Sequence, residues 1–155
     1  MVGAEENDWL TADAFRLYNK SAVLSDGAGA LYLRPAPSPI QLDCVTDSHL
    51  FAQNTPRAKI VHAMRSQLPS DGDALLCDGL QGVPRLDSAE EAAWSGWRGN
   101  RLSVKRILGE GLVAAAAWQC AAAVHAIAQG RSAANVSLVG TNQQAIGARF
   151  VAAPK

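Results

Sequence analysis

The chain has 155 residues, of which 48% are hydrophobic and 18% are charged. This size and composition suit one globular domain with a substantial core. Fourteen basic residues balance fourteen acidic ones, so charge offers no argument for a nucleic-acid or membrane-surface partner. Cys44, Cys77 and Cys120 are widely spaced, which is neither a disulfide framework nor a zinc pattern. No secretory signal is visible at the first residues, and we expect a cytoplasmic protein.

The first third of the chain contains short segments separated by turn signals. A short helix is expected over residues 11–19. Gly27 and Gly29 stand just ahead of an apolar run, residues 30–33, which predicts a strand after a glycine turn. A proline-rich connector follows, and the alternation of residues 40–45 predicts a second strand.

The middle of the chain predicts two helices on either side of a short strand. Thr55 is a candidate cap and Pro56 suits the first helical position, so a helix should start there. Residues 74–77 are apolar and predict a buried strand. Ser88, with a glutamate three residues later, forms a capping box that predicts a helix running to about Trp97.

The last third predicts a long helix followed by two strands. Residues 112–128 are rich in alanine and apolar on all sides, which is typical of a buried helix, and Gly130 can end it. The run is too short and too weakly apolar for a membrane span. Strands are expected over residues 136–139 and 145–151. The alternation predicts an α/β fold: a layered mixed sheet packed against helices, including the buried alanine-rich helix.

Four short motifs follow one another along the chain: residues 2–6 with 24–33, residues 73–94, Lys105 with Gly109-Glu110-Gly111, and Gly140-Thr141-Asn142. Their order resembles that of the β-ketoacyl synthases of the thiolase superfamily. Each motif alone is weak, but four in order at compatible spacings are stronger. The resemblance implies a thiolase-like C-terminal half over residues 38–155. Residues 1–37 would then be the end of a segment like the N-terminal half, which in the family carries the nucleophilic cysteine.

The resemblance also marks candidate site residues. The candidate catalytic positions are Asp78, Lys105 and Glu110, and the candidate substrate-binding positions are Leu138, Gly140, Thr141 and Asn142. Asp78 and Glu110 stand where the family has two histidines. An ionised carboxylate accepts hydrogen bonds but cannot donate one to an enolate oxygen, so the usual decarboxylative condensation is disfavoured. The cysteines fall within predicted strands or the long helix, and buried thiols are poor nucleophiles.

Alternatives remain for each of the three catalytic candidates. Glu110 is either a general acid or base, or a carboxylate at the positive start of the alanine-rich helix. Asp78 is either catalytic or a residue that shapes a turn. Lys105 either pairs with a carboxylate such as Glu110 or is solvated at the surface.

Three hypotheses about function follow. The first is a β-ketoacyl synthase-like subunit or half-domain of fatty-acid or polyketide-type chain assembly, without condensing activity on its own. The second is a condensing enzyme or acyltransferase that is active only with a separate cysteine-bearing half. The third is a truncated fragment with no separate function. The resemblance implies acyl-carrier-protein or CoA thioester substrates and no bound cofactor or metal. It also implies a ketosynthase N-terminal half or catalytic subunit as the partner in a homo- or hetero-oligomer, with acyl carrier protein as a further partner.

Overall fold

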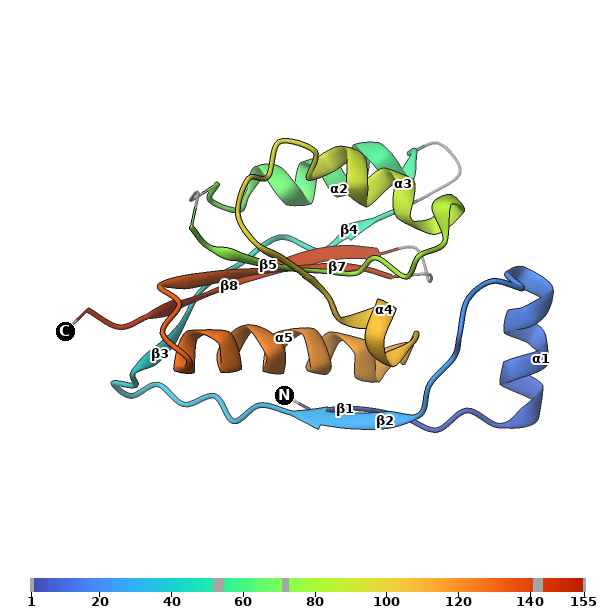
Figure 1. Ribbon diagram of the computed structural model, residues 1–155, viewed down its shortest axis with the longest axis horizontal. Helices are drawn as coiled ribbons and strands as arrows, with labels where there is room; N and C mark the ends of the chain where they lie inside the picture. The colour runs from blue at the N-terminus through green and yellow to red at the C-terminus, as the bar shows by residue number, and fades with distance from the viewer. Residues whose placement is uncertain (1, 52–54, 71–72, 141–143, 155) are drawn as a thin grey trace.

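A mixed sheet forms the centre of the molecule (Figure 1). The computed structural model describes residues 2–51, 55–70, 73–140 and 144–154. In this part of the chain six strands form the sheet, in the order β3–β8–β7–β5–β6, and β4 also pairs with β8. They are β3 (Ile40–Val45), β4 (His49–Leu50), β5 (Leu75–Asp78), β6 (Arg101–Ser103), β7 (Ala133–Val139) and β8 (Gln144–Ala152). β5 is parallel to β6 and β7, whereas β8 is antiparallel to β7, β3 and β4.

Helices cover both faces of this sheet. α2 (Arg57–Ser66) and α3 (Pro84–Ala93) lie on one face, and α5 (Val113–Ala128) lies on the other (Figure 1). β5 is buried on both sides: Leu75 and Cys77 pack in the α5 cluster, whereas Leu76 packs in the α2–α3 cluster. The predicted burial of the alanine-rich helix is confirmed, because its residues Ala114, Ala115, Ala117, Gln119, Cys120, Ala123 and Ile127 are buried.

A two-stranded ribbon covers the other side of α5. β1 (Val2–Glu5) and β2 (Gly27–Ala30) pair in antiparallel fashion and pack on α5, which therefore lies between the ribbon and the sheet (Figure 1). Between them α1 (Trp9–Tyr18), which Asp8 caps, buries no residue. The division expected at residue 37 falls in the connector between β2 and β3, and it stays a prediction. In the described residues no helix is long and apolar enough to cross a membrane.

Two of the local predictions need correction. The strand expected at residues 30–33 is formed by Gly27–Ala30 instead. The glycines are needed within the strand, because a Cβ at Gly27 would lie 2.4 Å from Cζ2 of Trp118. In α2 no side-chain cap forms; the N-cap residue is Pro56, so Thr55 does not cap the helix.

The start and end of α3 also differ from the prediction. The helix begins at Pro84 rather than Ser88 and ends at Ala93, before Trp97. The Asp87 carboxylate explains the early start, because it accepts hydrogen bonds from the backbone N–H groups of Gln81, Gly82 and Val83. These bonds draw the preceding loop onto the first turn, so the capping-box pattern does not mark the boundary.

Candidate functional site

A buried ion pair joins α4 (Val104–Leu108), a short helix that sequence reasoning missed, to the start of α5. Lys105 Nζ lies 2.7 Å from Oε2 of Glu110, and the two side chains are 5% and 2% exposed. Gln81 Nε2 donates to the same Glu110 oxygen at 2.8 Å, and the Leu112 N–H donates to Oε1 at 2.8 Å. Glu110 therefore pairs with Lys105 and holds the start of α5. A catalytic role for Glu110 stays a prediction.

The turn that carries Glu110 is fixed from its backbone as well. The Glu110 N–H donates to the Val23 carbonyl at 2.7 Å, and the Ser25 N–H donates to the Glu110 carbonyl at 3.0 Å. Gly109 has φ +86° and Leu112 has φ +44°, a conformation that costs a residue with a side chain about 1–2 kcal/mol. The hydrogen bonds with Val23 and Ser25 hold this strained turn, so both the backbone and the side chain of Glu110 are fixed in place.

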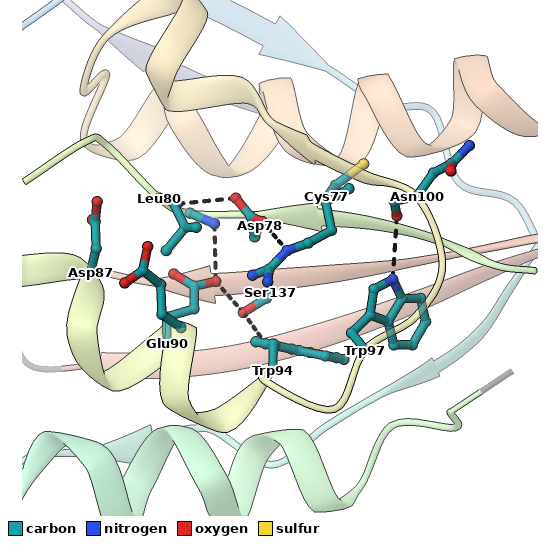
Figure 2. A network of polar contacts seen from close by, with 12 residues as sticks. Cys77, Asp78, Leu80, Asp87, Glu90, Trp94, Trp97, Asn100 and Ser137 are labelled. Atoms are coloured by element: carbon teal, nitrogen blue, oxygen red, sulfur yellow. Dashed lines mark hydrogen bonds and ion pairs between the residues drawn. The ribbon is translucent and has the colours of Figure 1, made fainter. Parts of the chain in front are cut away.

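Asp78 lies at the end of β5 in a second polar network, which Figure 2 shows. It is fully buried, and Arg101 Nε donates to its Oδ2 at 3.0 Å. The Leu80 N–H reaches Oδ1 at 3.3 Å, which is the contact of an Asx turn. Asp78 is thus a paired residue that shapes the loop after β5. Whether it also has a catalytic role is untested.

Glu90 belongs to the same network and has a raised pKa (Figure 2). The Gly79 N–H donates to its Oε1 at 3.0 Å, and the Ser137 hydroxyl donates to the same oxygen at 2.5 Å. Trp94 Nε1 in turn donates to the Ser137 hydroxyl at 3.1 Å. Burial raises the pKa of Glu90 to about 7, and the nearby Asp78 adds to the rise against these hydrogen bonds. Glu90 lies within the second motif, residues 73–94, and no sequence pattern marked Ser137.

Two cavities adjoin the Lys105 side chain. The first, of about 180 Å³, is lined by Lys105, Leu138 and Gly140 together with residues of α5 and β8. The second, of about 210 Å³, is lined by Lys105, Glu110 and Gln81 among others.

The predicted site residues are therefore brought together only in part. Lys105 and the candidate substrate-binding residues Leu138 and Gly140 share one cavity. Asp78 is not among the described residues that line either cavity. Thr141 and Asn142, the other candidate substrate-binding residues, lie outside the described residues.

The cysteines lie in the strands and the helix expected from the sequence, and their surroundings disfavour the thiolate form. Burial raises the pKa of Cys77 to about 12 and that of Cys120 to about 11. The pKa of Cys44 is also raised, first by burial and then by Asp43. Nucleophilic thiol chemistry needs the thiolate, which these surroundings disfavour at neutral pH.

Known structures resemble this arrangement. The ishigamide ketosynthase/chain length factor matches with a TM-score of 0.73 at 17% identity, over 99% of this chain and 49% of the other. This chain has a thiolase-like fold. The predicted fold class, a mixed α/β sheet packed against helices, is confirmed.

A second match is a structure described as a type II polyketide synthase acyl-carrier protein in complex with its ketosynthase bound to the hexaketide (AntDE:AntF). It has a TM-score of 0.56 at 8% identity and covers 74% of this chain and 33% of the other. The chain thus spans between a third and a half of the length of these neighbours. No family model matches the chain, and no curated protein matches it either.

Proposed function

We propose that the chain is a ketosynthase-like subunit or half-domain of polyketide-type acyl-chain assembly that does not condense acyl chains on its own. Its fold is shared with a ketosynthase/chain length factor and with a ketosynthase–carrier protein complex, which supports this class of function. Fatty-acid assembly belongs to the same proposal, since both kinds of chain growth use carrier-bound thioesters. The substrates would be acyl-carrier-protein or CoA thioesters, and no bound cofactor is needed.

One observation carries the proposed absence of condensing activity: both oxygens of Glu110 already accept hydrogen bonds. Lys105 and Gln81 occupy one oxygen and the Leu112 N–H occupies the other. Condensation by decarboxylation needs donors aimed at the developing enolate oxygen. A carboxylate paired in this way supplies none, and Asp78 is committed to Arg101 in the same manner.

An exposed apolar surface beside this turn supports a partner subunit. Val23, Ile107 and Leu108 line the second cavity together and are 70%, 71% and 48% exposed. Apolar side chains gathered at the surface are typical of protein interfaces. The proposed occupant is a ketosynthase N-terminal half or catalytic subunit that brings the nucleophilic cysteine, with acyl carrier protein as a further partner.

The test is decarboxylation of malonyl-loaded acyl carrier protein by the purified chain, followed as release of carbon dioxide. We expect no release above the rate without protein. A rate that is abolished by Glu110→Gln would contradict the proposal, because it would assign chemistry to that carboxylate. Asp13→Asn, at the exposed ion pair with Arg16, is the matched control, because it also replaces a carboxylate by an amide.

A second candidate function is a condensing enzyme or acyltransferase that is completed by a cysteine-bearing partner. The shared cavity of Lys105, Leu138 and Gly140 favours it, since three family-matched residues meet there. Turnover of an acyl thioester would be measured after mixing the chain with such a partner. Equal turnover by the wild type, Glu110→Gln and Asp78→Asn would remove the carboxylates from the mechanism and count against this candidate.

A further inference from the structure

Gln119 is a buried glutamine in the middle of the apolar helix α5, and its amide is oriented by the sheet. Its side chain is fully buried. Nε2 donates to the backbone carbonyl of Ser137 at 2.9 Å and reaches that of Cys77 at 3.4 Å. Because both partners are acceptors, the nitrogen must face the sheet. The amide oxygen of Gln119 is then turned away from these two carbonyls.

That oxygen has no hydrogen-bond partner within the described part of the chain. A buried acceptor without a partner costs about 1–3 kcal/mol, so native proteins rarely leave one unpaired. Gln119 lines the cavity of about 180 Å³ that Lys105, Leu138 and Gly140 also line. The oxygen itself is buried, so the adjoining cavity is the space from which a donor would reach it once the Gln119 amide shifts toward a bound molecule.

Lys105 supplies a hydrogen-bond donor to the same cavity. An ammonium group has three N–H donors. Among the described residues, Lys105 donates one of these to Glu110. A group bound in this cavity next to Lys105 and Gln119 would thus meet a donor and an acceptor, with apolar walls such as Leu138 around them.

We propose that Gln119 is a specificity-determining residue of this cavity. Its side-chain oxygen accepts a hydrogen bond from an O–H or N–H group of the bound molecule, while Lys105 donates to the oxygen of that molecule. The cavity would accordingly prefer a hydroxyl or a secondary amide over a ketone or ester of the same shape. This inference rests on the proposed function only for the identity of the natural acyl ligand.

Three probes of the same size separate ligands that can donate a hydrogen bond from one that cannot. 2-Butanone only accepts hydrogen bonds. N-methylacetamide replaces one of its CH₂ groups by N–H, and 2-butanol replaces its ketone by a hydroxyl. Each would be titrated into the ¹⁵N-labelled chain, and binding followed by amide chemical shifts around Gly140 and Gln119. The measured quantity is the affinity of the amide or the alcohol divided by that of the ketone. We expect this ratio to be about tenfold larger in the wild type than in Gln119→Met. The comparison with Gln119→Met cancels the different hydration of the probes.

The control variant is Ala116→Leu, which fills the cavity from another position of α5 and should weaken all three probes alike. Equal ratios in the wild type and Gln119→Met would overturn the proposal. If Gln119→Met does not fold, crystals of the wild type soaked with N-methylacetamide decide: its N–H must lie within hydrogen-bond distance of the Gln119 oxygen. A water at that position which neither donor probe displaces would also overturn the proposal. None of these outcomes changes the decarboxylation result, so the two proposals fail separately.

Discussion

Replacing Lys105 by methionine isolates the energetic role of the buried ion pair. Methionine keeps much of the apolar stem but leaves the Glu110 carboxylate, 2% exposed, without its counter-charge. Breaking a buried pair from one side costs about 3–5 kcal/mol. Gln81 and the Leu112 N–H still donate to the carboxylate, which favours the lower end of that range. We expect a loss of about 3 kcal/mol, or roughly a 10 °C fall in Tm for a chain of this size.

The assay is urea unfolding followed by circular dichroism, with calorimetry for Tm. The double variant Lys105→Met/Glu110→Gln should return to within about 1 kcal/mol of the wild type, because replacing both charges removes the desolvated carboxylate. Arg16→Met breaks the exposed pair with Asp13 and should cost less than about 0.5 kcal/mol. A Lys105→Met variant as stable as the wild type, or a double variant no better than the single one, would refute the reasoning.

Three further predictions concern Glu90, Gly111 and Asp87. The pKa of Glu90 is raised from 4.5 to about 7 on folding, so the folded state holds a proton that the unfolded chain has lost between those values. Stability should be full below about pH 4.5 and fall by roughly 3 kcal/mol as pH rises through about 7, and urea midpoints of Glu90→Gln should lack this slope. Gly111→Ala places a Cβ 2.3 Å from Cη2 of Trp118. We expect a loss of about 2 kcal/mol in stability with faster hydrogen exchange in β2, and unchanged exchange would contradict this close packing against Trp118. Asp87→Ala frees three backbone N–H groups of the loop and should cost about 2 kcal/mol in thermal unfolding, with Asp87→Asn recovering part.

Much of the framework could be predicted because it depends on burial patterns. The sequence of residues 40–45 alternates and predicted the strand, although a bulge between Leu42 and Cys44 interrupts the alternation of burial. β5 is a short apolar run buried on both faces, and the alanine-rich helix is apolar all round. Gly130, with φ +103°, follows the helix end as expected. Each of these signals is local, and tertiary packing reinforces it instead of overriding it.

The errors arose where a distant side chain decides the local structure. Asp87 binds three backbone N–H groups before it in sequence, so the first turn of α3 starts four residues ahead of Ser88. Trp118 sits against Gly27 and Gly29, which makes these glycines part of a strand instead of a turn before one. Neither contact has a signature in spacing or composition.

The candidate site was predictable to a similar extent. The motif pointed to Lys105, Leu138 and Gly140, and these residues share a cavity. It did not single out Gln81 or Gln119, whose importance comes from side-chain hydrogen bonds across the fold. A lone glutamine in an alanine-rich helix was the available signal, because a buried amide needs partners for both its nitrogen and its oxygen.

The contacts of Lys105 connect the buried ion pair to the neighbouring cavity. Its bond to Glu110 commits the carboxylate to the structure of the turn, and removing Lys105 alone should cost about 3 kcal/mol. The same side chain lines the cavity that Gln119 and Leu138 also line. A change that freed Glu110 for catalysis would therefore destabilise the start of α5, whereas changes at Gln119 or Leu138 would alter what binds.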